Sequence, residues 1–239
     1  MNLILLKPDE LKPDCERIRL TDRRFQHIRD VLKTVPGEPL RVGVLGGARY
    51  TARLENIGTD SCEIALVAES PTLPRPNIDV LLALPRPKCL KRLLPQASAL
   101  GIGRLYITGA EKVEKNYWGS RFLLPELYRP LLEEGLEQAA DTIPPEIIVA
   151  RRLKPLLEDV ITPRYADSCK LLAHPGEKSS SQIHSSACAP TIIAIGPEGG
   201  WTEYELTMFE RAGFIRYSLG PRILRADTAV IALVSSIRA

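Results

Sequence analysis

The feature that most constrains this chain is a regular alternation of short apolar runs and longer helical stretches after residue 78. The first run, Asp79–Leu84 (DVLLAL), is apolar after its first residue, as expected of a strand that is buried on both faces. Predicted helices over Leu90–Leu100 and Leu123–Ala140 follow it. Such alternation predicts a parallel sheet covered by helices. The other predicted strands are Arg104–Thr108, Ile147–Ala150, Cys169–Ala173, Thr191–Ile195 and Phe214–Ser218.

The chain changes character at a proline-rich break, Ser70–Asn77, which can continue neither a helix nor a central strand. Before it, residues 40–68 alternate in the manner of short strands separated by glycine turns. The sequence therefore predicts two domains, a small and mostly β domain over residues 1–72 and an α/β domain over residues 78–239. We also expect a short amphipathic helix with Phe25, Ile28, Val31 and Leu32 at helical spacing, and a mobile loop over Gly176–Pro190.

Composition excludes several classes of protein. No apolar run approaches the roughly 20 residues that cross a bilayer, and the first residues do not read as a signal peptide. The five cysteines lie far apart, with no CxxC pair and no histidine at ligand spacing, which suits a reducing cytosol. We expect a cytoplasmic protein with no metal and no membrane partner. A net charge of +3 permits a polyanionic partner without requiring one.

Ligand sites in parallel sheets lie beyond the carboxyl ends of the strands, which directs attention to two loops. In the first, strand Thr191–Ile195 runs into GPEGG and then into a helix whose start is marked by a capping box of Thr202 and Glu205. Glycines here let backbone N–H groups approach a ligand closely. A tight strand-to-helix connection would also require glycines, so both interpretations stay open. The spacing fits neither a P-loop nor a dinucleotide-binding fingerprint.

The second loop, SLGPRILRADTA, covers Ser218–Ala229 and joins the last strand to an apolar C-terminal helix. It carries Arg222, Arg225 and Asp227 within six residues. Asp227 is suited to capping the helix, and it can also have a functional role. The two arginines are either surface residues or ligands of an anion.

Together, IGPEGGWTEYE and SLGPRILRADTA resemble the signature of the RsmE family, the 16S ribosomal RNA uracil-N3 methyltransferases of the SPOUT superfamily. More loosely, HIRDVLKTVPGEPLRV resembles the N-terminal PUA-like RNA-binding domain of that family, and ALGI and LEQA match its middle section. The resemblance implies a SPOUT-type trefoil-knotted parallel sheet, a small β-barrel-like PUA-like domain, a homodimer, and ribosomal RNA of the small subunit as partner. It also implies S-adenosyl-L-methionine as the cofactor. The residues that would hold it are Leu172, Ala173, His174, Gly196, Pro197, Glu198, Gly199, Gly200, Leu219, Gly220, Ile223 and Leu224.

N3 of uracil lies on the Watson–Crick edge and carries a proton, so the base must be unpaired or flipped out before it can be methylated. The charge that then spreads onto O2 and O4 can be stabilised by arginine. The expected catalytic residues are Arg222 and Arg225, with Asp227 orienting one of them or assisting proton removal. In the N-terminal domain we expect a basic cluster to contact RNA phosphates, although an ordinary solvated helix face would look the same. Its members are Arg17, Arg23, Arg24, Arg29 and Lys33.

Three motifs depart from the family pattern. Gln96 and Ala99 stand where charged residues are usual, and Asp141 stands where a base is usual. Asp227 stands where glutamate is usual, which is a milder change. These departures leave the donor loops intact, so methyl transfer is better supported than the target. The alternatives are a SPOUT methyltransferase acting on a ribose 2′-O or another base, and a non-catalytic RNA-binding assembly factor.

Overall fold

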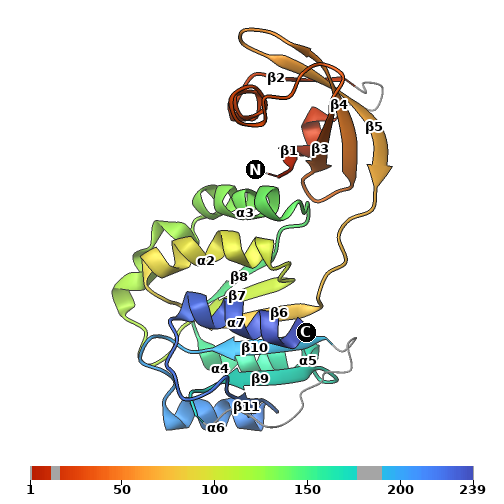
Figure 1. Ribbon diagram of the computed structural model, residues 1–239. Coiled ribbons are helices and arrows are strands. Elements are labelled where there is room, and N and C mark those ends of the chain that lie inside the picture. Colours follow the sequence, from red (N-terminus) through yellow and green to blue (C-terminus); the bar gives the residue numbers. More distant parts are fainter. Residues whose placement is uncertain (1, 12–16, 177–189, 239) are drawn as a thin grey trace. The chain divides into compact units, whose positions relative to one another are not determined.

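The computed structural model describes residues 2–11, 17–176 and 190–238, which form two compact units (Figure 1). The first unit comprises Met1–Pro74 with Glu133–Pro144, and the second comprises Arg75–Leu132 with Pro145–Ala239. The predicted domains did not include this return of residues 133–144 to the first unit. It rests on contacts between distant segments, since the Glu137 carbonyl accepts the N–H groups of Asn2 and Leu3. Residues 177–189 of the predicted mobile loop lie outside the described part.

The first unit is built on a five-stranded sheet with the strand order β1-β3-β4-β5-β2. β1 pairs with β3 in parallel and the other pairs are antiparallel. Alternate residues point inward, as along β2, where Ile18 and Leu20 are buried and Arg17 and Arg19 are exposed. The strands are β1 Ile4–Leu6, β2 Arg17–Leu20, β3 Pro39–Val44, β4 Arg49–Ile57 and β5 Cys62–Ser70; the helical segments are η1 Pro8–Glu10, α1 Arg23–Gln26 and η2 His27–Leu32.

The predicted amphipathic helix is wrong in its second half. Phe25 and Ile28 are buried in the core of the first unit, whereas Val31 is 65% exposed and Leu32 is also exposed. After the short α1, the chain continues as the π-helical η2. A π-helix bonds i to i+5, so residues beyond Ile28 do not return to the buried face at a spacing of 3.6.

The second unit contains a six-stranded sheet in the order β11-β9-β10-β6-β7-β8, with every neighbouring pair parallel. The chain runs outward through β6, β7 and β8, and then fills the other side. Every residue of β6 and β10 is buried, which explains why these strands read as continuous apolar runs. The strands are β6 Ile78–Ala83, β7 Arg104–Thr108, β8 Glu146–Ala150, β9 Cys169–Ala173, β10 Thr191–Ile195 and β11 Ile215–Tyr217.

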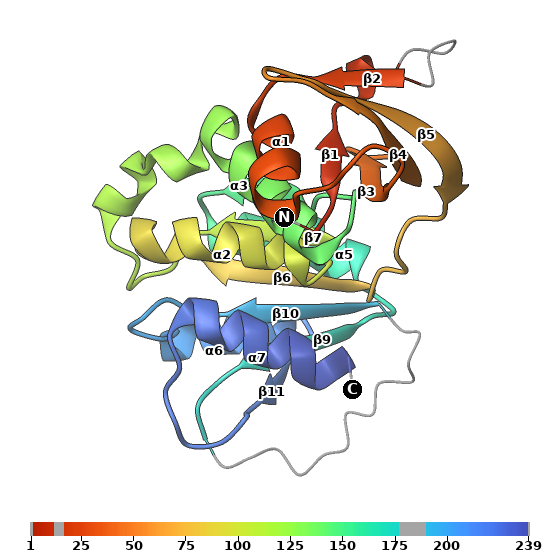
Figure 2. The same ribbon diagram turned by 45° about the horizontal axis from the view of Figure 1, so that its top comes forward.

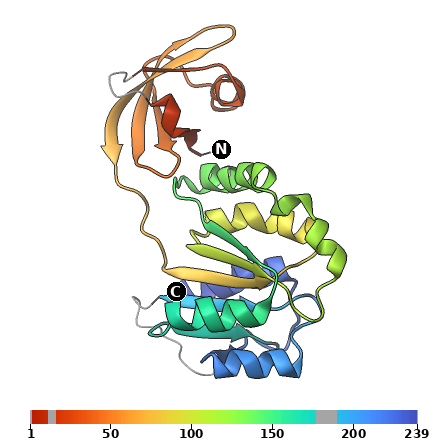
Figure 3. The same cartoon turned by 180° about the vertical axis from the view of Figure 1, so that it is seen from behind.

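Helices cover both faces of this sheet. Helices α2 and α7 contact each other over one face (Figure 2), and α4, η5, α5 and α6 cover the opposite one (Figure 3). No helix of the described residues is long and apolar enough to span a membrane. The helical segments from residue 87 onward are α2 Pro87–Ala99, η3 Lys115–Gly119, η4 Arg121–Leu123, α3 Pro125–Ala139, α4 Leu153–Pro155, η5 Leu156–Ile161, α5 Thr162–Arg164, α6 Glu203–Arg211 and α7 Ala226–Arg238. From Glu133 on, α3 belongs to the first unit.

Candidate functional site

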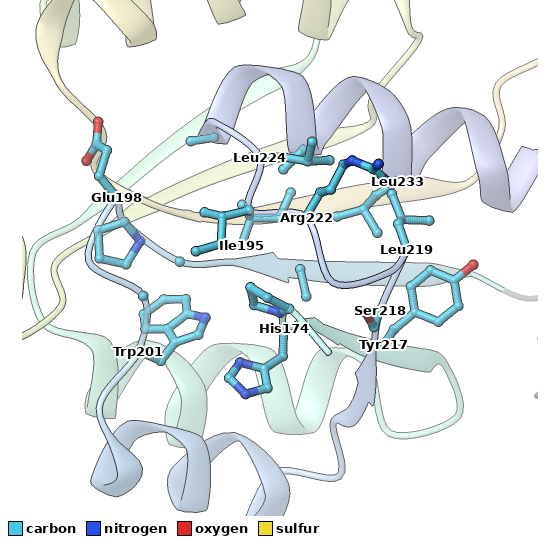
Figure 4. Close-up of a pocket in the computed structure, with 18 of the residues that line it drawn as sticks. His174, Ile195, Glu198, Trp201, Tyr217, Ser218, Leu219, Arg222, Leu224 and Leu233 are labelled. Atoms are coloured by element: carbon cyan, nitrogen blue, oxygen red, sulfur yellow. The ribbon is translucent and has the colours of Figure 1, made fainter. Parts of the chain in front are cut away.

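A cavity of about 390 Å³ opens in the second unit beyond the carboxyl ends of β9, β10 and β11 (Figure 4). At this edge β10 lies beside β6. The strands β7 and β8 lie on one side of this pair, and β9 and β11 lie on the other. Such switch points are where open parallel sheets bind ligands. In Figure 4 the loop with Leu219, Arg222 and Leu224 lies across the cavity from His174 and Trp201. The lining residues are Lys112, Ala173, His174, Pro175, Ile195, Gly196, Pro197, Glu198, Gly199, Gly200, Trp201, Tyr217, Ser218, Leu219, Gly220, Arg222, Ile223, Leu224, Ala226, Ala229 and Leu233.

The glycine-rich loop between β10 and α6 forms one wall. Gly200 has φ of +69°, a conformation that side chains disfavour, and a Cβ at Gly196 would stand 3.1 Å from Nε1 of Trp201. The predicted capping box is confirmed, because Thr202 Oγ1 accepts the Glu205 N–H and Glu205 accepts the Thr202 N–H. The wall is thus fixed by glycine geometry at one end and by the start of α6 at the other.

Neighbouring loops hold this wall at three further points. Glu198 accepts the N–H of Arg86 at 3.2 Å, just before α2, so its carboxylate points away from the cavity (Figure 4). Glu205 accepts the N–H of Glu111 at 2.7 Å. Lys112 donates from Nζ to the Gly199 carbonyl at 2.9 Å. Lys112 was not predicted, although it follows strand β7 and the rule that directed attention to the other loops applies to it as well.

The loop after β11 forms the opposite wall. The Gly220 N–H donates to Ser218 Oγ at 3.0 Å, and that hydroxyl also lies 3.1 Å from the Gly176 carbonyl. Gly220 has φ of +128°, which favours glycine strongly. Beyond it, Ile223 is 81% exposed although it lines the cavity. An apolar side chain left this open gains burial if a ligand fills the cavity.

Most of the predicted cofactor residues meet in this cavity. Of the twelve predicted, all but Leu172 line it, and Leu172 is fully buried inside β9. Arg222 lines the cavity too. Arg225 and Asp227 are not among the described residues that line the cavity. They flank Ala226, which lines it.

The expected pairing of Asp227 with an arginine of its own loop needs correction. Its Oδ2 accepts both Nε and Nη2 of Arg92 on α2, at 3.0 and 2.7 Å. Burial is the largest single influence and raises the pKa of Asp227. The hydrogen bonds and positive charge of Arg92, together with the Thr228 N–H, outweigh it, and the pKa is lowered. A carboxylate with a lowered pKa is a weak proton acceptor at neutral pH. Asp227 therefore joins α7 to α2. Its Oδ1 accepts the N–H of Thr228 from within the first turn rather than from the N-cap position.

Arg24 corrects the predicted RNA-contacting cluster. Its side chain is 11% exposed and is paired with Glu10 and Asp22. It also donates to the carbonyl of Leu5 at 2.9 Å. These hydrogen bonds raise the pKa of Arg24, Glu10 contributing most. A guanidinium enclosed by two carboxylates holds the first unit together and is not available to a phosphate.

The remaining members of the cluster are more open. Arg23 is bidentate with the buried Glu137, and Arg29 pairs with Asp30 while it lies over the ring of Phe25. Arg17 and Lys33 are exposed. Of the departures from the family pattern, Gln96 is exposed on α2. Asp141 is buried and accepts the N–H groups of Thr142 and Ile143, so it shapes a turn and does not form an outer surface.

The cavity combines features that suit a nucleoside. Leu219, Leu224 and Leu233 provide apolar surface for a flat ring, and the glycine turns bring backbone close to it. The indole Nε1 of Trp201 is a buried donor for which the described residues supply no acceptor. In Figure 4 this nitrogen is on the side of the ring that faces the cavity. The described residues include no group of three or more His, Cys, Asp or Glu that could hold a metal ion.

Comparison with known proteins agrees with this geometry. A family model described as RNA methyltransferase domain matches residues 71–238. The ribosomal RNA small subunit methyltransferase E of Treponema pallidum is 30% identical over 97% of this chain and 88% of its own length. Ribosomal RNA small subunit methyltransferase E 1 of Borreliella burgdorferi is 28% identical over 97% of this chain and 95% of its own.

A solved structure supports the fold over the whole length. The ribosomal RNA small subunit methyltransferase E of Neisseria gonorrhoeae, crystallised bound to S-adenosyl methionine, matches with a TM-score of 0.76. The match covers 100% of this chain and 97% of that chain at 22% identity. At this identity the match shows a shared α/β fold with a parallel sheet.

Proposed function

This chain belongs to the RNA methyltransferase family, and we propose that it transfers the methyl group of S-adenosylmethionine to N3 of a uracil in 16S ribosomal RNA. The observation that carries the proposal is the cavity, which brings together eleven of the predicted donor-binding residues, nine from the two loops and two from the end of β9. The names of the relatives from Treponema pallidum and Borreliella burgdorferi support the small ribosomal subunit as substrate.

The lining residues fit the proposed donor. The glycine-rich turn at Gly196–Gly200 and the turn at Gly220 bring backbone close to an adenosine, and the leucines across the cavity pack on its ring. The Nε1–H of Trp201, which has no acceptor among the described residues, gains one if a polar group of the donor reaches it. When bound, S-adenosylmethionine supplies a sulfonium-activated methyl group.

The reaction needs the target base outside its helix, because N3 is otherwise paired. Arg222 is the predicted catalytic residue that lines the cavity. Its guanidinium stabilises the negative charge that spreads over O2 and O4 as N3 loses its proton. Arg225 is exposed on the same loop and contacts the RNA. Asp227, held by Arg92, positions the loop through the start of α7.

The finer features of the fold belong to the same proposal. The C-terminal part forms a trefoil knot, and the first unit is a PUA-like RNA-binding domain. The protein acts in the cytoplasm as a homodimer. The curled five-stranded sheet of the first unit supports its assignment as a PUA-like domain.

The test is methyl transfer from labelled S-adenosylmethionine to purified small ribosomal subunits that lack their own modification, followed by identification of the nucleoside. We expect labelled 3-methyluridine. Another labelled nucleoside would favour a different RNA site, for which the exposed Gln96 on α2 is the motivating observation. Donor binding without any transfer, together with complementation of a deletion strain by Arg222→Ala, would favour an assembly factor.

A further inference from the structure

The exposed face at the start of α2 is basic. Lys88, Lys91 and Arg92 occupy its exposed positions in the first two turns, and the helix contains no Asp or Glu. Arg86, at the N-cap, has a side chain that is 67% exposed. This face does not cover the core, which α2 contacts through residues such as Leu90 and Leu93.

The positive charge continues beyond the helix. The guanidinium of Arg121 lies 5.2 Å from the ring centroid of Phe122, and the ammonium of Lys91 lies 5.8 Å from the same centroid. Two cations from separate segments therefore flank one half-buried aromatic ring. We call Arg86, Lys88, Lys91, Arg92 and Arg121 the basic strip.

The basic strip borders the cavity at two points. The backbone of Arg86 bonds the carboxylate of Glu198, which lines the cavity. Arg92 bonds Asp227, the neighbour of the lining residue Ala226. A nucleotide whose base reaches a methyl donor held in the cavity has its flanking phosphates within one or two nucleotides of this rim, because the sugar–phosphate chain is continuous.

Apart from Arg92, which pairs with Asp227, stability does not explain the strip. Cations at the start of a helix meet the positive end of its dipole and repel one another, whereas acidic residues are favoured there. Carboxylates neutralise part of this charge at two positions. Asp227 pairs with Arg92, and Oε1 of Glu198 lies 3.9 Å from Nε of Arg86. An anion bound along the strip would reduce both the repulsion among these cations and their unfavourable interaction with the helix dipole.

We propose that the basic strip is the surface of the second unit that grips the RNA backbone next to the target base. This inference rests on the proposed function and deepens it. The contacts are to phosphates and carry no sequence information. They are independent of the cluster predicted in the first unit, where Arg24 is buried in ion pairs.

The test compares two triple variants of the full-length protein. The strip variant carries Lys88→Glu, Lys91→Glu and Arg121→Glu. The control variant carries Lys154→Glu, Arg164→Glu and Arg211→Glu, three exposed cations on α4, α5 and α6 over the opposite face of the sheet. Both change the net charge equally. The readout is affinity for an unmodified small-subunit rRNA transcript over a salt series, with donor affinity measured by calorimetry.

We expect the strip variant to lose roughly tenfold or more in RNA affinity at moderate salt. Its salt slope should fall by about 2, since each lost phosphate contact removes about 0.7–0.9. The control variant should change by less than about threefold, and donor affinity should stay the same in both. Equal losses in the two variants, or none in the strip variant, would overturn the inference.

Two further outcomes are distinguishable. If the strip variant loses RNA affinity only together with a change of oligomeric state in sedimentation, the strip is an interface between copies and the inference fails. If the wild type binds neither donor nor RNA, the proposed function fails first. Replacing the same three residues with alanine gives a milder variant in case charge reversal prevents folding.

Discussion

Replacing Arg92 with alanine removes the cation that faces Asp227 at the start of α7. The Asp227 side chain is 14% exposed and that of Arg92 is 55% exposed, so the ion pair is buried on one side. Fully exposed pairs contribute about 0.2–1 kcal/mol, and removing one partner of a buried pair costs about 3–5 kcal/mol. The cost of Arg92→Ala comes from leaving the largely buried Asp227 carboxylate without its partner. It lies between these limits, and after a discount for solvent screening we expect about 1–2 kcal/mol. For a protein of this size that lowers the melting temperature by about 2–8 °C.

The effect should depend on pH with a defined sign. The pKa of Asp227 is lowered in the folded protein. Burial, the largest single influence, raises it, but the hydrogen bonds and positive charge of Arg92, together with the Thr228 N–H, outweigh burial. The pair therefore stabilises the fold above the ordinary aspartate pKa of about 4, and this contribution is lost as the pH falls through the lowered value. The difference between wild type and Arg92→Ala should be constant near neutral pH and should narrow below about pH 4.

The assay is thermal unfolding from pH 7 downward for the wild type, Arg92→Ala, Asp227→Asn and the double variant. Lys88→Ala is the matched control, since Lys88 is exposed one turn earlier on the same helix, and it should shift stability by less than about 0.5 kcal/mol. A coupling energy below about 0.3 kcal/mol between the two sites would refute the reasoning, because that is within ordinary additivity. A difference that persists unchanged at low pH would also refute it.

Two other residues give predictions of opposite kinds. Lys112→Met removes the hydrogen bond to the Gly199 carbonyl and should weaken S-adenosylmethionine binding about fivefold, because an exposed hydrogen bond contributes about 1 kcal/mol. Calorimetry measures this affinity, and Lys112→Arg should retain most of it. Arg24→Ala removes the cation that Glu10 and Asp22 share and should cost about 3–5 kcal/mol in urea unfolding. Arg29→Ala, at an exposed position, should leave the urea midpoint nearly unchanged. Native stability of Arg24→Ala with reduced RNA affinity would instead restore Arg24 as an RNA contact.

The strands of the second unit were predictable because their signal is local. Arg104–Thr108, Cys169–Ala173 and Thr191–Ile195 have the predicted bounds, since a strand buried on both faces reads as an apolar run whatever its neighbours are. Strand β1 is an apolar run of only three residues, and β2 alternates buried and exposed residues over only four, so neither was predicted. The helix over Leu153–Arg164 was also missed, because it is broken by π-helical turns.

The sequence by itself determined the parallel α/β class and the two loops that line the cavity, because glycine positions, capping residues and apolar periodicity act within a few residues of the chain. Only the tertiary structure decided which distant side chains meet. The order β9-β10-β6-β7 brings the loops that follow β6 and β7 to the glycine-rich turn, and so places Arg86 and Lys112 beside it. Because α2 packs against α7, Arg92 can donate hydrogen bonds to the carboxylate of Asp227. Charge along the chain cannot reveal such partners, because an ion pair depends on distance in space and on burial.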